Sequence, residues 1–319
     1  MSPFFKGGVK RRRLFKDKLL IFMTFASQLI QYLFTGLTLG SIYALVALGF
    51  TMIYNATGII NLAQGEFVML GGLVMVFFTA VLKMPLYLAF LLTILVVTLL
   101  GVIFERLAIH PLKEASLITL IMIPLAGSIL FRGGAMFLWG KDPYALPPFT
   151  QSQPLHFLGA TLQAQIFWVL GITVLAVAGV HFFFNRTLIG KAITACAFNP
   201  LAARLMGINV RRMVLLSFAL SAAVGAVAGM IITPITLMEY DRGPLLGLKG
   251  FAAAVLGGLG SGFGSVVAGF IIGILESFGA GLISSGYKDA IALMALLVIL
   301  WVKPSGLFGS KEESELKKF

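Results

Sequence analysis

Three polar side chains that could do chemistry stand close together inside an otherwise apolar run, Ile59–Gly72, which reads IINLAQGEFVMLGG. Asn61 and Gln64 carry amides, and Glu66 carries a carboxylate. Within a bilayer, ionisable side chains and unwound backbone persist only where they face protein or a water-filled cavity. The segment therefore predicts part of a translocation pathway. The simpler alternative is a polar loop that only connects two spans.

A second carboxylate, Glu276, lies in the apolar run GFIIGILESFG. Its position indicates either a pathway side chain, like Glu66, or a paired structural carboxylate at the end of a helix. A short internal echo links the two halves of the chain, since Met69–Leu73 reads MLGGL and Val255–Leu259 reads VLGGL. Transporters are often built from repeats, with the substrate site where the repeats meet.

The sequence contains no arrangement of side chains typical of catalysis or metal binding. The single cysteine, Cys196, excludes an intramolecular disulfide, and the three histidines lack the spacing of metal ligands: His110, His156 and His181. A phosphate-binding G-x-x-x-x-G-K-[ST] motif is missing, because Gly190–Lys191 is followed by Ala192. We therefore expect no cofactor, no metal and no ATP hydrolysis on this chain.

Composition assigns the broad class. Of the 319 residues, 59% are hydrophobic and 11% are charged, and the mean hydropathy is +1.00. Several apolar runs are long enough to cross the hydrocarbon core of a membrane, which is about 30 Å thick. We predict an all-α, polytopic transmembrane helical bundle.

The net charge of +12 is concentrated in short segments beside the apolar runs, which argues against a nucleic-acid partner. Seven of the first eighteen residues are basic, and further basic residues cluster at 106–113, 186–212 and 303–318. The positive-inside rule assigns such segments to the cytoplasm. We interpret 1–18 as a retained cytoplasmic tail, 19–309 as the membrane domain and 310–319 as a charged cytoplasmic tail.

The apolar runs predict eight to ten membrane spans, depending on which glycine-rich helices are broken or re-entrant. The first two runs, Leu19–Phe34 and Thr38–Tyr54, are separated by Gly36. The other runs are Phe67–Leu82, Pro85–Phe104, Leu117–Trp139, Ile166–Phe184, Met213–Ile232, Leu245–Leu259, Val266–Ile283 and Ala290–Val302. The Pro- and Gln-rich connection 141–165 is expected outside the cell, on the side opposite the basic loop 186–212.

Small residues recur at every fourth position late in the chain. They are Gly257, Ser261, Ser265, Gly269, Gly273, Ser277 and Gly281. On one helix this spacing forms a ridge that lets a partner backbone approach closely, and the alternative is that the turn at Gly260–Gly264 breaks the helix. We predict that Gly269, Gly273 and Ser277 pack against another helix; Gly36/Gly40 form a shorter version of the pattern.

The basic loop carries the signals of a short helix. Asn199 and Pro200 offer an N-cap and a first helical residue, and Gly207 occupies the position that ends a helix. Leu201 and Leu205 are four residues apart and share a face, with Ala202 beside it. A helix this short is unstable alone in water, so it must be held by a partner.

These segments resemble the permeases of branched-chain amino acid ABC importers. The resemblance is carried by GSIYALVALGFTMIYNATGIINLAQGEFVMLGG (Gly40–Gly72), FAAAVLGGLGSGFGSVVAGFIIGILES (Phe251–Ser277) and KPSGLFG (Lys303–Gly309). It covers nearly the whole chain, from Leu29 to Gly309. TLIGKAITACAFNPLAARLMGINV (Thr187–Val210) is similar to the cytoplasmic coupling segment of that family.

The resemblance implies a permease subunit of the bacterial cytoplasmic (inner) membrane that imports branched-chain amino acids or related small solutes. Its implied partners are a second related permease subunit, two cytoplasmic ATP-binding cassette subunits and a periplasmic solute-binding protein. The implied coupling residues are Gly190, Asn199, Pro200, Leu201, Ala202, Ala203, Leu205 and Gly207. Both termini are expected in the cytoplasm. The alternative is an ion-coupled secondary transporter in which Glu66 and Glu276 carry ions.

Overall fold

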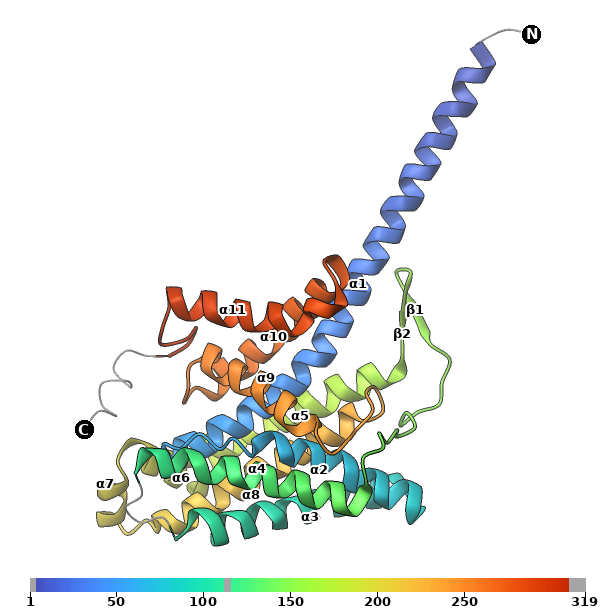
Figure 1. The fold of residues 1–319 in the computed structure, drawn as a ribbon. Helices are drawn as coiled ribbons and strands as arrows, with labels where there is room; N and C mark the ends of the chain where they lie inside the picture. The colour runs from blue at the N-terminus through green and yellow to red at the C-terminus, as the bar shows by residue number, and fades with distance from the viewer. Residues whose placement is uncertain (1–3, 112–115, 310–319) are drawn as a thin grey trace.

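The computed structural model describes residues 4–111 and 116–309 and is built almost entirely of helices (Figure 1). The α-helices are α1 (Phe4–Thr57), α2 (Gln64–Val76), α3 (Leu86–Phe104), α4 (Leu117–Trp139), α5 (Ala164–Arg186), α6 (Leu188–Phe198), α7 (Pro200–Leu205), α8 (Val210–Ile232), α9 (Arg242–Gly257), α10 (Gly262–Leu282) and α11 (Lys288–Val302). Two π-helical segments, η1 (Phe77–Val81) and η2 (Glu105–Ile109), extend α2 and α3, and a 3-10 turn, η3 (Ser285–Tyr287), precedes α11.

Eight helices in the described part of the chain are long and apolar enough to cross a membrane. The predicted fold class, an all-α polytopic bundle, is confirmed. The tail predicted over 310–319 lies outside the described residues, and so do the side chains of the tail predicted over 1–18.

Two of the ten apolar runs are not separate spans. The runs on either side of Gly36 belong to one helix, α1, whose apolar part is Phe25–Thr57. Gly36 lies within the continuous helix α1. Its lack of a side chain leaves room for the backbone of Ile274 in α10, which an added Cβ would overlap. The run Leu245–Leu259 corresponds to α9, whose 16 residues reach about 24 Å, less than the hydrocarbon thickness of about 30 Å.

A small hairpin shows that the 141–165 connection and the N-terminal end of the α1 span lie on the same side of the membrane. Strands β1 (Leu155–Phe157) and β2 (Ala160–Leu162) pair antiparallel within the connection predicted to be external. The Thr161 N–H donates to Gln31 Oε1 of α1 at 3.0 Å, so the hairpin lies against the N-terminal end of the α1 span. A cytoplasmic N-terminus and an external 141–165 connection are therefore incompatible, because both adjoin the same end of one helix.

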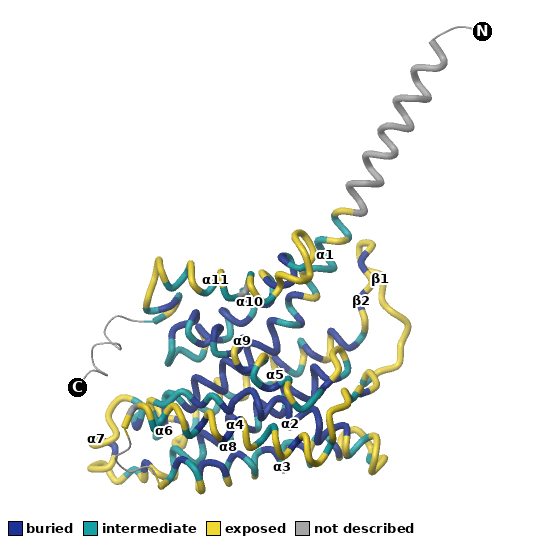
Figure 2. Tube along the Cα trace, viewed as in Figure 1, coloured by how far each residue is buried: buried dark blue, intermediate teal, exposed yellow. Residues whose placement is uncertain are grey.

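Helix α2 occupies the centre of the bundle. All thirteen of its residues are buried. Figure 2 shows that buried positions concentrate on α1, α2 and α8, whereas much of α3, α4 and α11 is exposed. The exposed apolar positions of these outer spans are compatible with lipid. The polar groups of α2 are enclosed by protein, because the whole helix is buried.

Helices α1 and α10 cross at close range through small residues. A Cβ added to Gly269 or Gly273 would collide with the backbone of α1. The Ser277 hydroxyl donates to the Tyr32 carbonyl oxygen of α1 at 2.7 Å. Gly269, Gly273 and Ser277 thus pack against α1, where lipid provides no hydrophobic drive and close contact must supply the attraction. The seven small residues do not form one ridge, because Gly257 ends α9 and Ser261 precedes α10.

We expect Gly273→Leu to destabilise the protein by about 1–3 kcal/mol or more, because the new side chain would overlap the backbone of α1 at Gly40. Thermal unfolding of the detergent-solubilised protein measures the effect. Gly133→Leu is the matched control, since a Cβ at Gly133 meets no atom within 4 Å. Equal unfolding temperatures for the two variants would contradict the close α1–α10 contact.

Candidate functional site

The chain between α1 and α2 is not helical, and it enters the bundle before α2 begins. Gly58 has a φ of +70°, which turns the chain after α1. Asn61 is buried, and its Oδ1 accepts the Ala63 N–H at 3.2 Å, so the amide closes a local turn. The Asn61 carbonyl oxygen then accepts the Gln64 N–H at 3.0 Å. Asn61 therefore organises the start of α2.

Gln64 ties this start to α8. Its Oε1 accepts the Ser221 hydroxyl at 2.6 Å, and its Nε2 donates to the Ser221 carbonyl oxygen at 3.3 Å. The same hydroxyl lies 2.9 Å from the Gly49 carbonyl oxygen of α1. Ser221 is the central residue of the α8 span, since Val210 and Ile232 are equally distant from it. The polar start of α2 therefore lies about halfway across the membrane.

Glu66 ties the first turn of α2 to α4. Its side chain has no exposed surface, and its Oε1 accepts the Ser128 hydroxyl at 2.6 Å. Arg132 Nε lies 3.7 Å from the same oxygen. The other carboxylate oxygen packs on Gly243 in the first turn of α9, where an added Cβ would overlap it. A carboxylate in the first turn of a helix is stabilised by the helix dipole, which favours Glu66 at this position.

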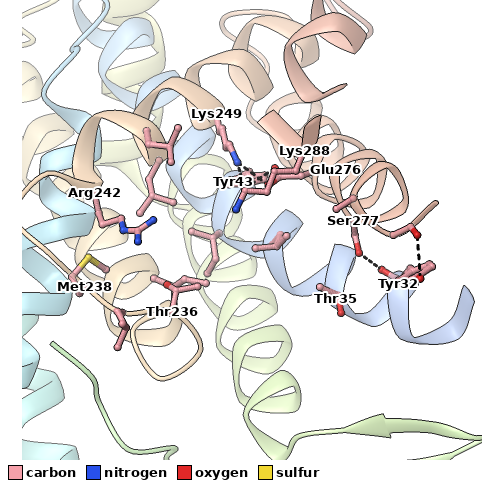
Figure 3. Close-up of a pocket in the computed structure, with 18 of the residues that line it drawn as sticks. Tyr32, Thr35, Tyr43, Thr236, Met238, Arg242, Lys249, Glu276, Ser277 and Lys288 are labelled. Carbon is pink, nitrogen blue, oxygen red and sulfur yellow. Dashed lines mark hydrogen bonds and ion pairs between the residues drawn. The ribbon is translucent and has the colours of Figure 1, made fainter. Parts of the chain in front are cut away.

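A second polar cluster lines a cavity of about 380 Å³ between α1, α9 and α10. Figure 3 shows Tyr43, Lys249 and Glu276 converging there from the three helices. Lys249 Nζ lies 2.7 Å from Glu276 Oε1 and 2.6 Å from Asp289 Oδ1 of α11, and the Tyr43 hydroxyl donates to Glu276 Oε2 at 2.8 Å. Lys249 is thus a buried cation shared by two carboxylates.

The structure separates the predicted pathway residues into two places. Glu276 lies on the cavity wall, whereas Asn61, Gln64 and Glu66 lie in the packed interior. The first turn of α9 connects the two places, because Arg242 lines the cavity and the following glycine contacts Glu66.

Sequence reasoning missed Lys249 together with its partners Tyr43 and Asp289. The signal was available, since Lys249 is a lone charge inside the apolar run Leu245–Leu259. The contact of Lys249 with Tyr43, 206 residues earlier in the chain, was not available from the sequence. Among the described residues, no group of three His, Cys, Asp or Glu side chains could hold a metal ion.

The short helix in the basic loop forms α7. Asn199 Oδ1 accepts the Ala202 N–H at 2.9 Å, and Pro200 is the first helical residue. Gly207 has a φ of +82° and donates its N–H to Arg204, while Ile208 donates to the Ala203 carbonyl oxygen; these two bonds form a Schellman motif.

One face of α7 is packed and the other is open. Ala203 is buried with Cys196 of α6 and Val210 of α8. Leu201 and Leu205, which the sequence places on one face, are exposed at 67% and 82%. In α6, Gly190 is buried and has no room for a side chain beside Phe183 and Phe184. The loop therefore presents an ordered apolar surface with no partner in this chain's described residues.

Residues 32–300 match the family described as branched-chain amino acid transport system, permease component. The chain belongs to this family. The permease is 32% identical over 303 residues to the high-affinity branched-chain amino acid transport system permease protein BraD of Pseudomonas aeruginosa, covering 89% of this chain and 96% of the relative. It is 33% identical over 299 residues to the corresponding protein LivH of Escherichia coli K12, with the same coverage. It is 29% identical over 286 residues to the probable branched-chain amino acid transport permease protein LivH of Methanocaldococcus jannaschii, covering 84% of this chain and 89% of the relative.

We expect Lys249→Met to destabilise the permease by about 3–5 kcal/mol, because it leaves a buried carboxylate without its cation. The midpoint of thermal unfolding in detergent measures the loss. The double variant Lys249→Met/Glu276→Gln should recover part of it, since the buried negative charge is then also removed. Lys141→Met, at an exposed position, is the control, and an equal midpoint for Lys249→Met and Lys141→Met would rule out a stabilising role for the cluster.

Gly243→Ala should weaken the packing of α9 against α2 by about 1–3 kcal/mol, because its methyl group would occupy the place of the Glu66 carboxylate. Gly134→Ala is the matched control, since an added Cβ there meets nothing within 4 Å. Unfolding midpoints of the two purified variants should differ. If Gly243→Ala unfolds at or above the wild-type midpoint, the carboxylate does not depend on that space.

Proposed function

We propose that this permease subunit moves branched-chain amino acids or related small solutes into the cytoplasm. The proposed partners are a second related permease subunit, two cytoplasmic ATP-binding cassette subunits and a periplasmic binding protein that delivers the solute. The observation that carries the proposal is the family match over residues 32–300, together with relatives that cover most of the chain and are named as permeases of branched-chain amino acid transport systems.

The exposed face of α6 and α7 supports a contact with an ATPase subunit. Leu201, Leu205 and Met206 are exposed beside one another, yet they lie in a connection between spans and not within one. Exposed apolar surface outside a span is typical of a protein interface. The capped ends of α7 and the burial of Ala203 fix this surface relative to α8. A displacement of α7 would therefore move α8, whose Ser221 is hydrogen-bonded to Gln64 of α2.

The proposed path passes both polar clusters. Glu276 and its ion pairs lie on the wall of the cavity, and Gln64 and Glu66 lie halfway across the bundle with Asn61 before them. The first turn of α9 touches both places, so a small movement of α9 would connect them.

The proposed orientation places α6 and α7 in the cytoplasm of a bacterium, with the protein in the inner membrane. Five basic residues between 186 and 212 support this side for the loop. The hairpin and the N-terminal end of the α1 span then lie on the periplasmic side, because α5 crosses between the hairpin and α6. This orientation replaces the cytoplasmic N-terminus inferred from charge alone.

Uptake into liposomes tests the proposal. The permease is purified with its partner subunits, reconstituted with the binding protein outside, and supplied with labelled leucine, isoleucine or valine and with ATP inside. We expect uptake that requires internal ATP and no ion gradient. Uptake driven by a proton or sodium gradient without ATP would support the ion-coupled alternative instead.

Leu205→Asp should uncouple transport while leaving the fold intact, because the new charge lies on the exposed face of α7. ATPase subunits should co-purify poorly or hydrolyse ATP without uptake. Ala203→Glu should give the same defect by displacing α7 from its buried contact.

Gln153→Asp, at an exposed position in the loop at the opposite end of the bundle, is the control and should transport normally. If Leu205→Asp shows wild-type uptake and solute-stimulated hydrolysis, the face of α7 is not the coupling surface.

A further inference from the structure

Arg132 is a cation inside a membrane span whose guanidinium is not fully hydrogen-bonded by the described residues. It belongs to the α4 span Ile118–Trp139, one turn after Ser128. Its Nε lies 3.7 Å from Glu66 Oε1, which is too long for a hydrogen bond, and Nε has no hydrogen-bond partner among the described residues. The Arg132 side chain is nevertheless 34% exposed, whereas that of Glu66 is fully buried.

Lipid does not explain the exposed part of Arg132. A guanidinium that faces hydrocarbon is costly, and arginines in membrane spans normally extend toward the membrane surface to avoid that cost. Here the Nε edge faces Glu66, which is bonded to Ser128 at the middle of α4. The guanidinium is therefore held toward the centre of the span, and its exposed part requires water or a polar partner.

The structure leaves space beside this cation. Gly133 and Gly134 follow it directly, and an added Cβ at either position would meet no atom within 4 Å. Exposed apolar side chains occupy other positions of the same helix, Leu130 and Phe137 away from Arg132 and Leu125 on its side. Most exposed positions of α4 are therefore apolar and suit lipid. The position of Arg132, a cation followed by two glycines, does not suit lipid.

We propose that Arg132 lines the water-filled translocation path and receives the carboxylate of the passing amino acid. Because the Nε edge of the guanidinium faces Glu66, the two terminal amino groups are left to donate two parallel hydrogen bonds to a solute carboxylate. Glu66 and Ser128 act as positioning residues that fix the orientation of the guanidinium. This inference rests on the proposed function, since it assumes a solute that bears a carboxylate.

The pairing of Arg132 with Glu66 suits a site that binds its solute weakly and releases it. Glu66 offsets the charge of Arg132, so the site has little net charge when empty. A zwitterionic amino acid would gain two hydrogen bonds and little additional electrostatic attraction. A path site must bind its solute weakly enough to release it.

Cysteine labelling tests whether this side of α4 faces water without changing Arg132. Met136 is one turn further along the same side as Arg132, whereas Leu130 points about 160° away around the helix. Met136→Cys and Leu130→Cys are made with Cys196→Ser, which removes the native thiol. In the complete importer, a charged, membrane-impermeant thiol reagent should modify Met136→Cys and not Leu130→Cys, while a lipid-soluble reagent should modify Leu130→Cys.

Either of two labelling results would overturn the proposal. If neither cysteine reacts with the charged reagent, this side of α4 is packed against lipid or against the second permease subunit. If both cysteines react equally with the charged reagent, water reaches both sides of α4 and the side of Arg132 is not a distinct path. The assay requires no knowledge of the solute, so it can fail independently of the proposed transport function.

Substitution of Arg132 tests the carboxylate contact in the same reconstituted importer. Arg132→Lys keeps a charge beside Glu66 but loses the planar fork, so it should retain the wild-type unfolding midpoint and subunit composition while uptake falls about tenfold or more. Arg132→Gln should show a similar or larger loss of uptake. Wild-type uptake by Arg132→Lys would contradict the carboxylate contact, whereas absence of ATP-driven uptake by the unmodified importer would contradict the proposed function itself.

Discussion

The absence of water in the hydrocarbon core is the constraint on which this structure depends. Each polar group that enters the core must find a partner within the protein, because an unpaired one costs several kcal/mol. The first turn of α2 meets part of this demand through its neighbours: Gln64 bonds to α8 and Glu66 Oε1 bonds to α4. Glu66 Oε2 packs on α9 and has no hydrogen-bond partner among the described residues. A short polar segment thereby determines where four helices meet.

Close packing of small residues follows from the same constraint. Hydrophobic association is weak in lipid, so helices are held by van der Waals contact and by hydrogen bonds at short range. Gly269 and Gly273 let α10 approach the backbone of α1, and the Ser277 hydroxyl bonds to a carbonyl oxygen of α1. The Lys249 cluster adds a charged contact where α9, α10 and α11 meet. Small residues thus stabilise the contact of α10 with α1, and the buried charge of Lys249 stabilises the contacts of α9 with α10 and α11.

Exposed side chains have different meanings inside and outside the spans. Exposed leucines on α3 and α4 suit lipid, and they need no further partner. Leu201 and Leu205 are equally apolar, but they lie in a connection between spans, where an exposed apolar face indicates a protein contact. Arg132 is the converse case, because a polar group lies where apolar side chains are expected.

The sequence by itself determined the membrane class, the helical fold and the ends of α7, because hydropathy, charge and capping preferences act over a few neighbouring residues. It also identified Glu66 and Glu276 as unusual, since a charge in an apolar run is visible without a structure. Only the tertiary structure decided their partners: Ser128 for Glu66, and Lys249 with Tyr43 for Glu276. It also showed that α1 continues through Gly36, because the contact with α10 that explains this glycine joins residues more than two hundred positions apart. Contacts at that separation depend on how the helices pack, and local sequence patterns do not encode them.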